Sequence, residues 1–144
     1  MKGIQEFVTH DYVTLYITIL FFHIIADYSL QGVLAQMKTV RFWKDLKERE
    51  SKRQDGFKIS TKDWLMPMIE HSFMWSFIVH LPIMIFYTVN PMIILISILT
   101  HTCFHFLIDS LKANANAINL ITDQFAHMIQ LLFVMGLPGL IINN

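Results

Sequence analysis

The sequence predicts an all-α protein, a four-helix transmembrane bundle that forms one domain over residues 1–144. Hydrophobic residues make up 54% of the chain and charged residues only 15%, whereas an ordinary soluble domain is about one quarter charged. The charges are also segregated, because nine of the eleven Lys and Arg residues lie between Lys38 and Lys62. Four long apolar stretches leave too little polar surface for a soluble protein of this length. A lipid bilayer is therefore the expected surrounding.

Each apolar stretch is long enough to cross a bilayer, which takes about 20 mostly apolar residues in a helix. Tyr12 and Tyr16 suit the headgroup level at the start of the first span. Asn90-Pro91 is typical of a tight turn and separates the second span from the third. The predicted spans are residues 12–37, 64–89, 92–112 and 117–142.

The segment 38–63 is the one extended polar stretch, and we expect a basic loop or a helix on the membrane surface. Phe42, Trp43 and Leu46 recur at helical spacing among cations, a pattern that favours binding to anionic lipid headgroups. Nucleic acid is a less suitable partner, because four acids interrupt the basic run: Asp45, Glu48, Glu50 and Asp55.

The basic segment also predicts the orientation of the chain in the membrane. Short loops rich in Lys and Arg stay in the cytoplasm, so the segment 38–63 and Lys112 are expected on the cytoplasmic side. Four spans then place both termini on the non-cytoplasmic side. The oligomeric state stays open, a homo-oligomer included.

Polar residues recur at four-residue spacing within the apolar stretches. Residues four apart share one face of a helix, so each set forms a polar stripe on an otherwise apolar span. The sets are His101, His105 and Asp109, then His23, Asp27 and Gln31, and finally Asp123 and His127.

These stripes are expected to meet in the cytoplasmic half of the bundle. Counted from the predicted span ends, Asp27 lies about 15 Å deep and His71 and His105 about 10 Å deep. Asp123 and His127 lie about 9 and 15 Å beyond residue 117. The outer half carries few polar groups, chiefly His80, for which we expect a structural role.

Charged groups inside a bilayer cost several kcal/mol unless they pair or bind a cation. His and Asp together are ligands for zinc, manganese or iron, and zinc is the metal we expect first. The predicted metal ligands are His23, Asp27, His71, His105, Asp109, Asp123 and His127, of which Asp27, Asp109 and Asp123 are also the catalytic candidates. Residues expected to contact these ligands are Gln31, Lys38, His101, Lys112 and Gln124.

A network of hydrogen bonds between His and Asp, without a metal, is the alternative to a metal site. Lys38 and Lys112 lie close enough to the membrane surface to reach buried carboxylates with their long side chains. Such a network would hold the helices in register and would need no ligand.

Four stretches resemble motifs of DUF3307, a family of small bacterial and phage membrane proteins. They are His23-Ile-Ile-Ala-Asp27-Tyr-Ser-Leu-Gln31 followed by Lys38, then His71, then His105-Phe-Leu-Ile-Asp109-Ser-Leu-Lys112, then Asp123-Gln124-Phe-Ala-His127. The family is similar in layout to predicted membrane-bound metal-dependent hydrolases. By analogy, the resemblance implies a metal-centred hydrolase in a bacterial inner membrane.

The first functional hypothesis is therefore a metal-dependent hydrolase that acts from the cytoplasmic side on a lipid or another phosphate-containing substrate. The metal would activate water, and a carboxylate or imidazole would move protons. A proton or metal-ion transport protein with a His/Asp relay is the second hypothesis, and the sparse outer half counts against it. The third is a non-enzymatic phage or bacterial protein, either a pore former or an inhibitor of a host membrane protein.

Overall fold

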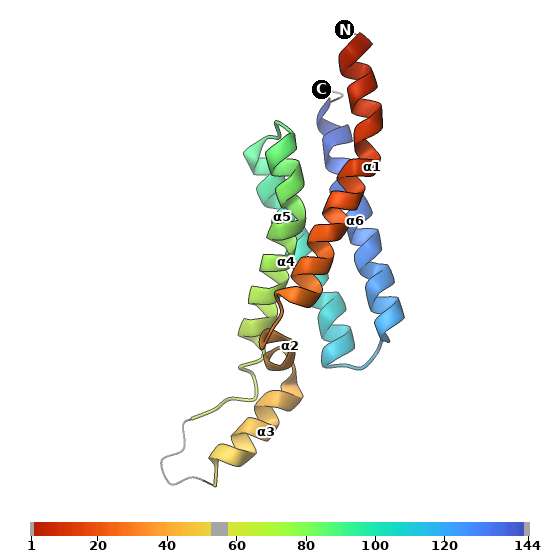
Figure 1. Ribbon diagram of the computed structural model, residues 1–144. Coiled ribbons are helices and arrows are strands. Elements are labelled where there is room, and N and C mark those ends of the chain that lie inside the picture. The colour runs from red at the N-terminus through yellow and green to blue at the C-terminus, as the bar shows by residue number, and fades with distance from the viewer. Residues whose placement is uncertain (1, 53–57, 143–144) are drawn as a thin grey trace.

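The computed structural model describes residues 2–52 and 58–142, with side chains for 12–52 and 58–137. The described residues form helices and no strand. Long helices make the bundle, and two short ones extend from one of its ends (Figure 1), which we call the α3 end. The long helices are α1 (Lys2–Ile24), α4 (Leu65–Phe86), α5 (Pro91–Ala113) and α6 (Leu120–Ile142), and the short ones are α2 (Leu34–Met37) and α3 (Val40–Glu50). The predicted all-α four-helix bundle is confirmed.

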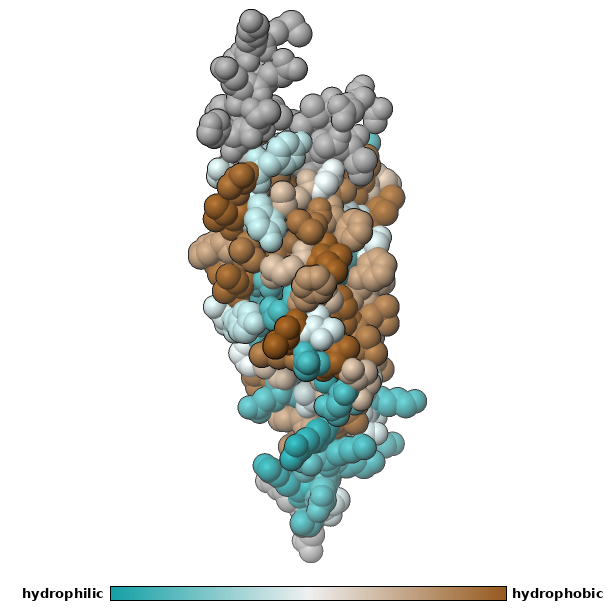
Figure 2. Space-filling view, turned by 90° about the vertical axis from the view of Figure 1, so that its right-hand side faces the viewer, coloured by the Kyte–Doolittle hydropathy of each residue, from teal (hydrophilic) through white to brown (hydrophobic). Residues whose placement is uncertain are grey.

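The surface of the bundle shows that the protein is a multi-pass membrane protein. Four windows are long and apolar enough to span a bilayer: Tyr12–Ser29, Leu65–Phe86, Pro91–Ala113 and Leu120–Leu137. Large apolar side chains point outward along them, with Ile121 80% exposed and Phe133 70% exposed. In Figure 2 a brown apolar belt covers the bundle and teal polar residues gather toward the α3 end. So much exposed apolar surface is stable only against lipid.

The first membrane helix ends earlier than the predicted residue 37. α1 continues as a π-helical turn, η1 (Ile25–Ser29), and the chain then turns through Gly32 into α2. Gly32 has φ +46°, a left-handed conformation that glycine adopts without steric cost and that cannot continue a right-handed helix. Asp27 therefore lies in the last turn of the span, much nearer the α3 end than the predicted depth of about 15 Å.

The last helix begins three residues later than predicted, at Leu120 instead of residue 117. The Asn119 side chain explains the difference, because its Oδ1 accepts a hydrogen bond from Thr122 N at 2.9 Å. Asn is a favoured cap of this kind for the free N–H groups of a first helical turn.

A tight elbow joins α2 to α3 and presses against the end of α5. Thr39 caps α3, its hydroxyl accepting from Phe42 N. Asn114 then holds the elbow from the other side: its Oδ1 accepts from Val40 N at 2.7 Å, and its Nδ2 donates to Lys38 O at 3.2 Å. These bonds fix the backbone on both sides of Thr39 and direct the Lys38 side chain into the bundle.

The half of the bundle away from α3 contains the apolar core. Its buried side chains come from all four long helices and include Leu15, Ile19, Val79, Ile83, Ile94, Ile98, Leu131 and Val134. Trp75 and Ala26 complete this core and border the polar groups nearer the α3 end.

We predict that Asn144 lies outside the cytoplasm and that Ser51 lies inside it. A phosphatase fused at Asn144 should therefore be active, and a fluorescent protein fused near Ser51 should fluoresce. The expectation follows from the basic composition of α3 and from the even number of spans. Paired phosphatase and fluorescent-protein fusions would measure it. A cytoplasmic C-terminus would contradict the orientation.

We predict that Gly32→Ala lowers the free energy of unfolding by about 1 kcal/mol, because alanine is strained at a positive φ. No atom lies within 4 Å of the added Cβ, so backbone strain is the cause. Gly136→Ala is the matched control, since it is also uncrowded but helical, and alanine there should be neutral or stabilising. Equal effects of the two changes in denaturant titrations would contradict the assignment.

Candidate metal centre

Polar side chains from all four long helices and η1 converge near the α3 end of the bundle. One ligand atom from each of Asp27, His105, Asp109 and His127 lies within 4.8 Å of the others, and all four residues are buried. His71 joins them, with its Nε2 3.2 Å from His105 Nε2 and 3.3 Å from Asp109 Oδ2. Together with Asp123 these residues are called the His/Asp cluster. The four-residue spacing in α5 and α6 thus brings the polar side chains of these two helices together in the cluster.

The separations within the cluster resemble the edges of a metal coordination polyhedron. Zinc–ligand distances of 2.0–2.1 Å imply ligand–ligand edges of about 3.3 Å in a tetrahedral site. Asp109 Oδ2 lies 3.3 Å from His71 Nε2 and 3.7 Å from His105 Nε2. His127 Nε2 lies 3.4 Å from Asp109 Oδ1, and His71 Nε2 lies 3.6 Å from Asp27 Oδ1. The donor set is the one that zinc, manganese and iron bind.

The hydrogen bonds of His127 direct an unprotonated nitrogen into the cluster. Gln130 Nε2 donates to His101 O at 3.4 Å, which leaves Gln130 Oε1 to accept from His127 Nδ1 at 3.0 Å. The neutral ring then carries its proton on Nδ1 and a lone pair on Nε2. This Nε2 is fully buried, has no hydrogen-bond partner and lies 3.5 Å from Asp123 Oδ1. Metal-ligating histidines are oriented in the same way, by donation from the second ring nitrogen.

The charges of the cluster are incompletely balanced by protein side chains. Lys38 Nζ lies 2.5 Å from Asp109 Oδ2, and Lys112 Nζ lies 2.5 Å from Asp123 Oδ2. Asp27 accepts from the amides of Gln31 at 2.8 Å and Gln124 at 3.0 Å.

Among the described side chains, Asp27 forms no ion pair with a lysine or arginine. Three buried carboxylates thus face two ammonium groups, and an uncompensated buried charge costs several kcal/mol. A bound cation would supply the missing charge, as would a second proton on His127.

His23 is placed differently from the metal-ligand role that its spacing predicts. Trp75 Nε1 donates to His23 Nδ1 at 2.8 Å, so the neutral ring carries its proton on Nε2. That Nε2 is buried and has no partner, and the ring centroid lies 5.8 Å from that of His127. In this state His23 presents an N–H donor beside the cluster instead of a lone pair.

The two histidines farther from the α3 end form a separate network. His80 bonds through Nδ1 to Ser76 O at 2.7 Å and through Nε2 to Ser97 Oγ at 2.8 Å, in agreement with a structural role. His101 Nδ1 donates to Ser97 O at 2.9 Å. His101 is linked to the predicted ligand His127 through Gln130, whose Nε2 donates to the His101 carbonyl oxygen.

Three residues that shape the cluster were not predicted from the sequence: Trp75, Asn114 and Gln130. Trp75 stacks on His105, with centroids 4.2 Å apart and planes at 18°, and closes the cluster on the side of the apolar core. Helical spacing offered a signal for two of them, because Trp75 lies four residues after His71 and Gln130 three after His127. Asn114 lies outside any polar stripe and gave no such signal.

Comparison of the chain with protein-family models, curated proteins and solved structures found no match. The resemblance to DUF3307 therefore stays a prediction that rests on the quoted motifs alone.

We predict that protein purified in detergent retains a divalent transition metal and that Asp109→Asn lowers its affinity by more than about 100-fold. Asp109 lies near three imidazoles, so its loss should affect the whole cluster. Glu70→Gln is the matched control, since it removes the same charge next to His71 from an exposed side chain.

Elemental analysis after dialysis would measure both variants, and retention should fall in acid because the ligands must be deprotonated. Metal-free protein whose thermal stability does not change on metal addition would favour the hydrogen-bond network.

Proposed function

We propose that this protein is a membrane-embedded, metal-dependent hydrolase. The observation that carries the proposal is the pair of unpartnered buried atoms, His127 Nε2 and Asp123 Oδ1, in a cluster whose charges are not balanced. A cation between them would satisfy both atoms. The resemblance to DUF3307 supports the same interpretation by analogy. Zinc is the expected metal, with manganese or iron as the alternatives.

A divalent cation in this position would make bound water more acidic and polarise an ester or phosphoryl oxygen. The protein residues would supply the remaining chemistry. Asp109, Asp123 and His127 would hold the cation, and Lys38 would keep the Asp109 carboxylate in place. The free Nε2–H of His23 is available to donate to a substrate oxygen.

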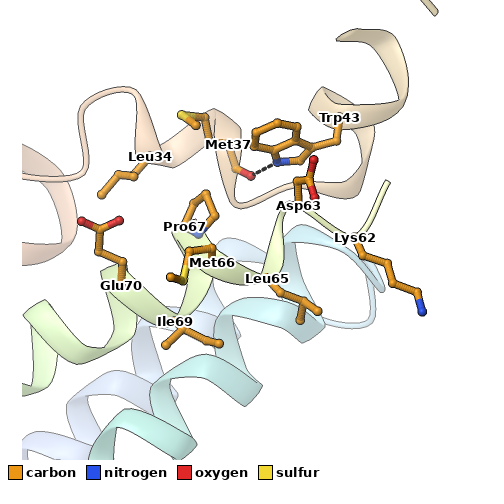
Figure 3. Close-up of a pocket in the computed structure, with 10 residues that line it drawn as sticks. All are labelled: Leu34, Met37, Trp43, Lys62, Asp63, Leu65, Met66, Pro67, Ile69 and Glu70. Carbon is orange, nitrogen blue, oxygen red and sulfur yellow. Dashed lines mark hydrogen bonds between the residues drawn. The ribbon is translucent and has the colours of Figure 1, made fainter. Parts of the chain in front are cut away.

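A groove at the α3 end of the bundle supports a lipid as the substrate. It has a volume of about 550 Å³ and lies between the α2–α3 elbow and the start of α4 (Figure 3). Its lining is mostly apolar, with Leu34, Met37, Met66, Pro67 and Ile69, and it also contains the carboxylates of Asp63 and Glu70.

None of the cluster residues lines the groove, but its residues Met37 and Glu70 are chain neighbours of Lys38 and His71. An acyl chain would suit the apolar part, with the headgroup toward the cluster. The cations of α3 would attract anionic lipids to the same end of the bundle.

We predict that protein reconstituted in vesicles that contain phosphatidic acid or phosphatidylglycerol releases a water-soluble product, either inorganic phosphate or a headgroup. Chelation should stop the release and added metal should restore it. Asp109→Asn and Asp123→Asn should be inactive, while Glu48→Gln, on the exposed surface of α3, should keep its activity. Metal-loaded, folded protein that hydrolyses neither lipid would count against a phospholipid substrate, and a failure on neutral ester and lipid-linked phosphate substrates as well would end the hydrolase proposal.

Transport of protons or metal ions is the second candidate, and the His80–Ser97–His101 network favours it. These buried polar groups extend the polar path beyond the His/Asp cluster, away from the α3 end. The apolar core counts against transport, because Ile83, Ile94 and Val134 are buried beyond this network, farther from the α3 end. A metal-free protein without catalytic or transport activity would leave the non-enzymatic role, as a pore former or an inhibitor of a host protein.

A further inference from the structure

We propose that the His/Asp cluster binds two divalent metal ions bridged by the carboxylate of Asp109. This inference rests on the proposed metal-dependent function and specifies its centre. The two oxygens of Asp109 face different imidazoles. Oδ2 lies 3.3 Å from His71 Nε2 and 3.7 Å from His105 Nε2, whereas Oδ1 lies 3.4 Å from His127 Nε2. A carboxylate with ligands gathered at each oxygen is the arrangement of a bridging ligand.

The first position, called site A, lies between His71, His105, Asp27 and Asp109 Oδ2. The two Nε2 atoms are 3.2 Å apart, and His71 Nε2 is 3.6 Å from Asp27 Oδ1. Gln31 Nε2 is 2.8 Å from Asp27 Oδ1 and 3.2 Å from His71 Nε2. Because an amide nitrogen can only donate, His71 Nε2 accepts and is unprotonated. Site A thus gathers imidazole and carboxylate donors at separations of 3.2–3.7 Å, against an edge of about 3.3 Å in a tetrahedral site.

The second position, called site B, lies between His127, Asp123 and Asp109 Oδ1. His127 Nε2 and Asp123 Oδ1 are 3.5 Å apart, each residue is 0% exposed, and neither atom has a hydrogen-bond partner. Asp123 also lies outside the group of four whose ligand atoms approach within 4.8 Å. An ion centred on those four would therefore leave Asp123 Oδ1 unsatisfied, and a second ion at site B would satisfy it.

The lysines are compatible with two ions. Lys38 Nζ contacts Asp109 Oδ2, and Lys112 Nζ contacts Asp123 Oδ2. Each carboxylate oxygen has two lone pairs, so Asp109 Oδ2 can accept from Lys38 and still bind a metal. At Asp123 the lysine and the proposed ion use different oxygens.

The charge of a two-metal centre indicates the class of substrate. Two divalent cations and two ammonium groups exceed the charge of three carboxylates, so the loaded centre attracts an anion. Paired metals clamp the attacking and leaving oxygens of a phosphoryl group. The substrate class is then a phosphate ester carried by a lipid, not a carboxylic ester. Hydrolysis would join a water oxygen to phosphorus and break the phosphorus–oxygen bond to the alcohol, which gains a proton as water loses one.

The test is the number of manganese ions bound by metal-stripped protein, with the electron paramagnetic resonance spectrum as a second readout. Wild type should bind two Mn²⁺ per chain. Ions bridged at about 3.5–4 Å are close enough for magnetic exchange, so their spectrum should differ from that of isolated Mn²⁺. Asp123→Asn should bind one ion with an uncoupled spectrum, and Glu70→Gln should bind two. Inorganic phosphate should perturb the coupled spectrum of wild type.

One bound ion in fully loaded wild type, or two ions with no coupling, would overturn the two-metal centre. Asp123→Asn keeps the side-chain shape, and the helical circular dichroism of each variant checks its fold. His71→Ala removes a ligand from site A and should also leave one ion. One ion together with lipid hydrolysis would retain the proposed function and reject the pair. Two coupled ions without hydrolysis of any ester would retain the two-metal centre and reject the proposed function.

Discussion

The structure depends on the burial of three carboxylates, Asp27, Asp109 and Asp123, inside a bundle whose outer surface suits lipid. Two of them obtain ammonium partners from different segments: Lys38 comes from the α2–α3 elbow and Lys112 from the last turn of α5. The elbow is therefore part of the buried site and not merely a connection between spans. Its hydrogen bonds to Asn114 keep Lys38 directed inward. A lysine in water would otherwise be more stable, because burial of a charge carries a desolvation cost.

The location of the cluster near the α3 end follows from the same constraint. Backbone groups inside a bilayer must be satisfied within helices or by neighbouring protein, so departures from regular helix are easiest near a span end. η1 and Gly32 lie at such an end, and they place Asp27 beside α4 and α6. The opposite half is filled mainly by apolar side chains, with the buried His80–Ser97–His101 network among them. The carboxylates thus gather in one half of the bundle and the apolar core in the other.

Periodicity and composition were enough to predict the four spans and the stripes that carry His105, Asp109, Asp123 and His127, because both depend on local spacing. The end of the first span at Ser29 was not predictable in this way, since apolar residues continue beyond it and the left-handed Gly32 breaks the helix. The ring nitrogen of His23 that carries the proton was also not predictable from the sequence. It is determined by Trp75, 52 residues away in the chain, and such a pairing has no signature in either segment.

The long sequence separation of the polar contacts has a consequence for biogenesis. Asp27 receives an amide from Gln124, 97 residues later in the chain, and Lys38 meets Asp109 71 residues later. During synthesis, the first span therefore enters the membrane before the Gln124 amide that donates to Asp27 has been made. The first three spans cannot reach their final stability until α6 leaves the ribosome. A chain that stops short of α6 would leave Asp27 without the Gln124 amide and Asp109 without the His127 imidazole.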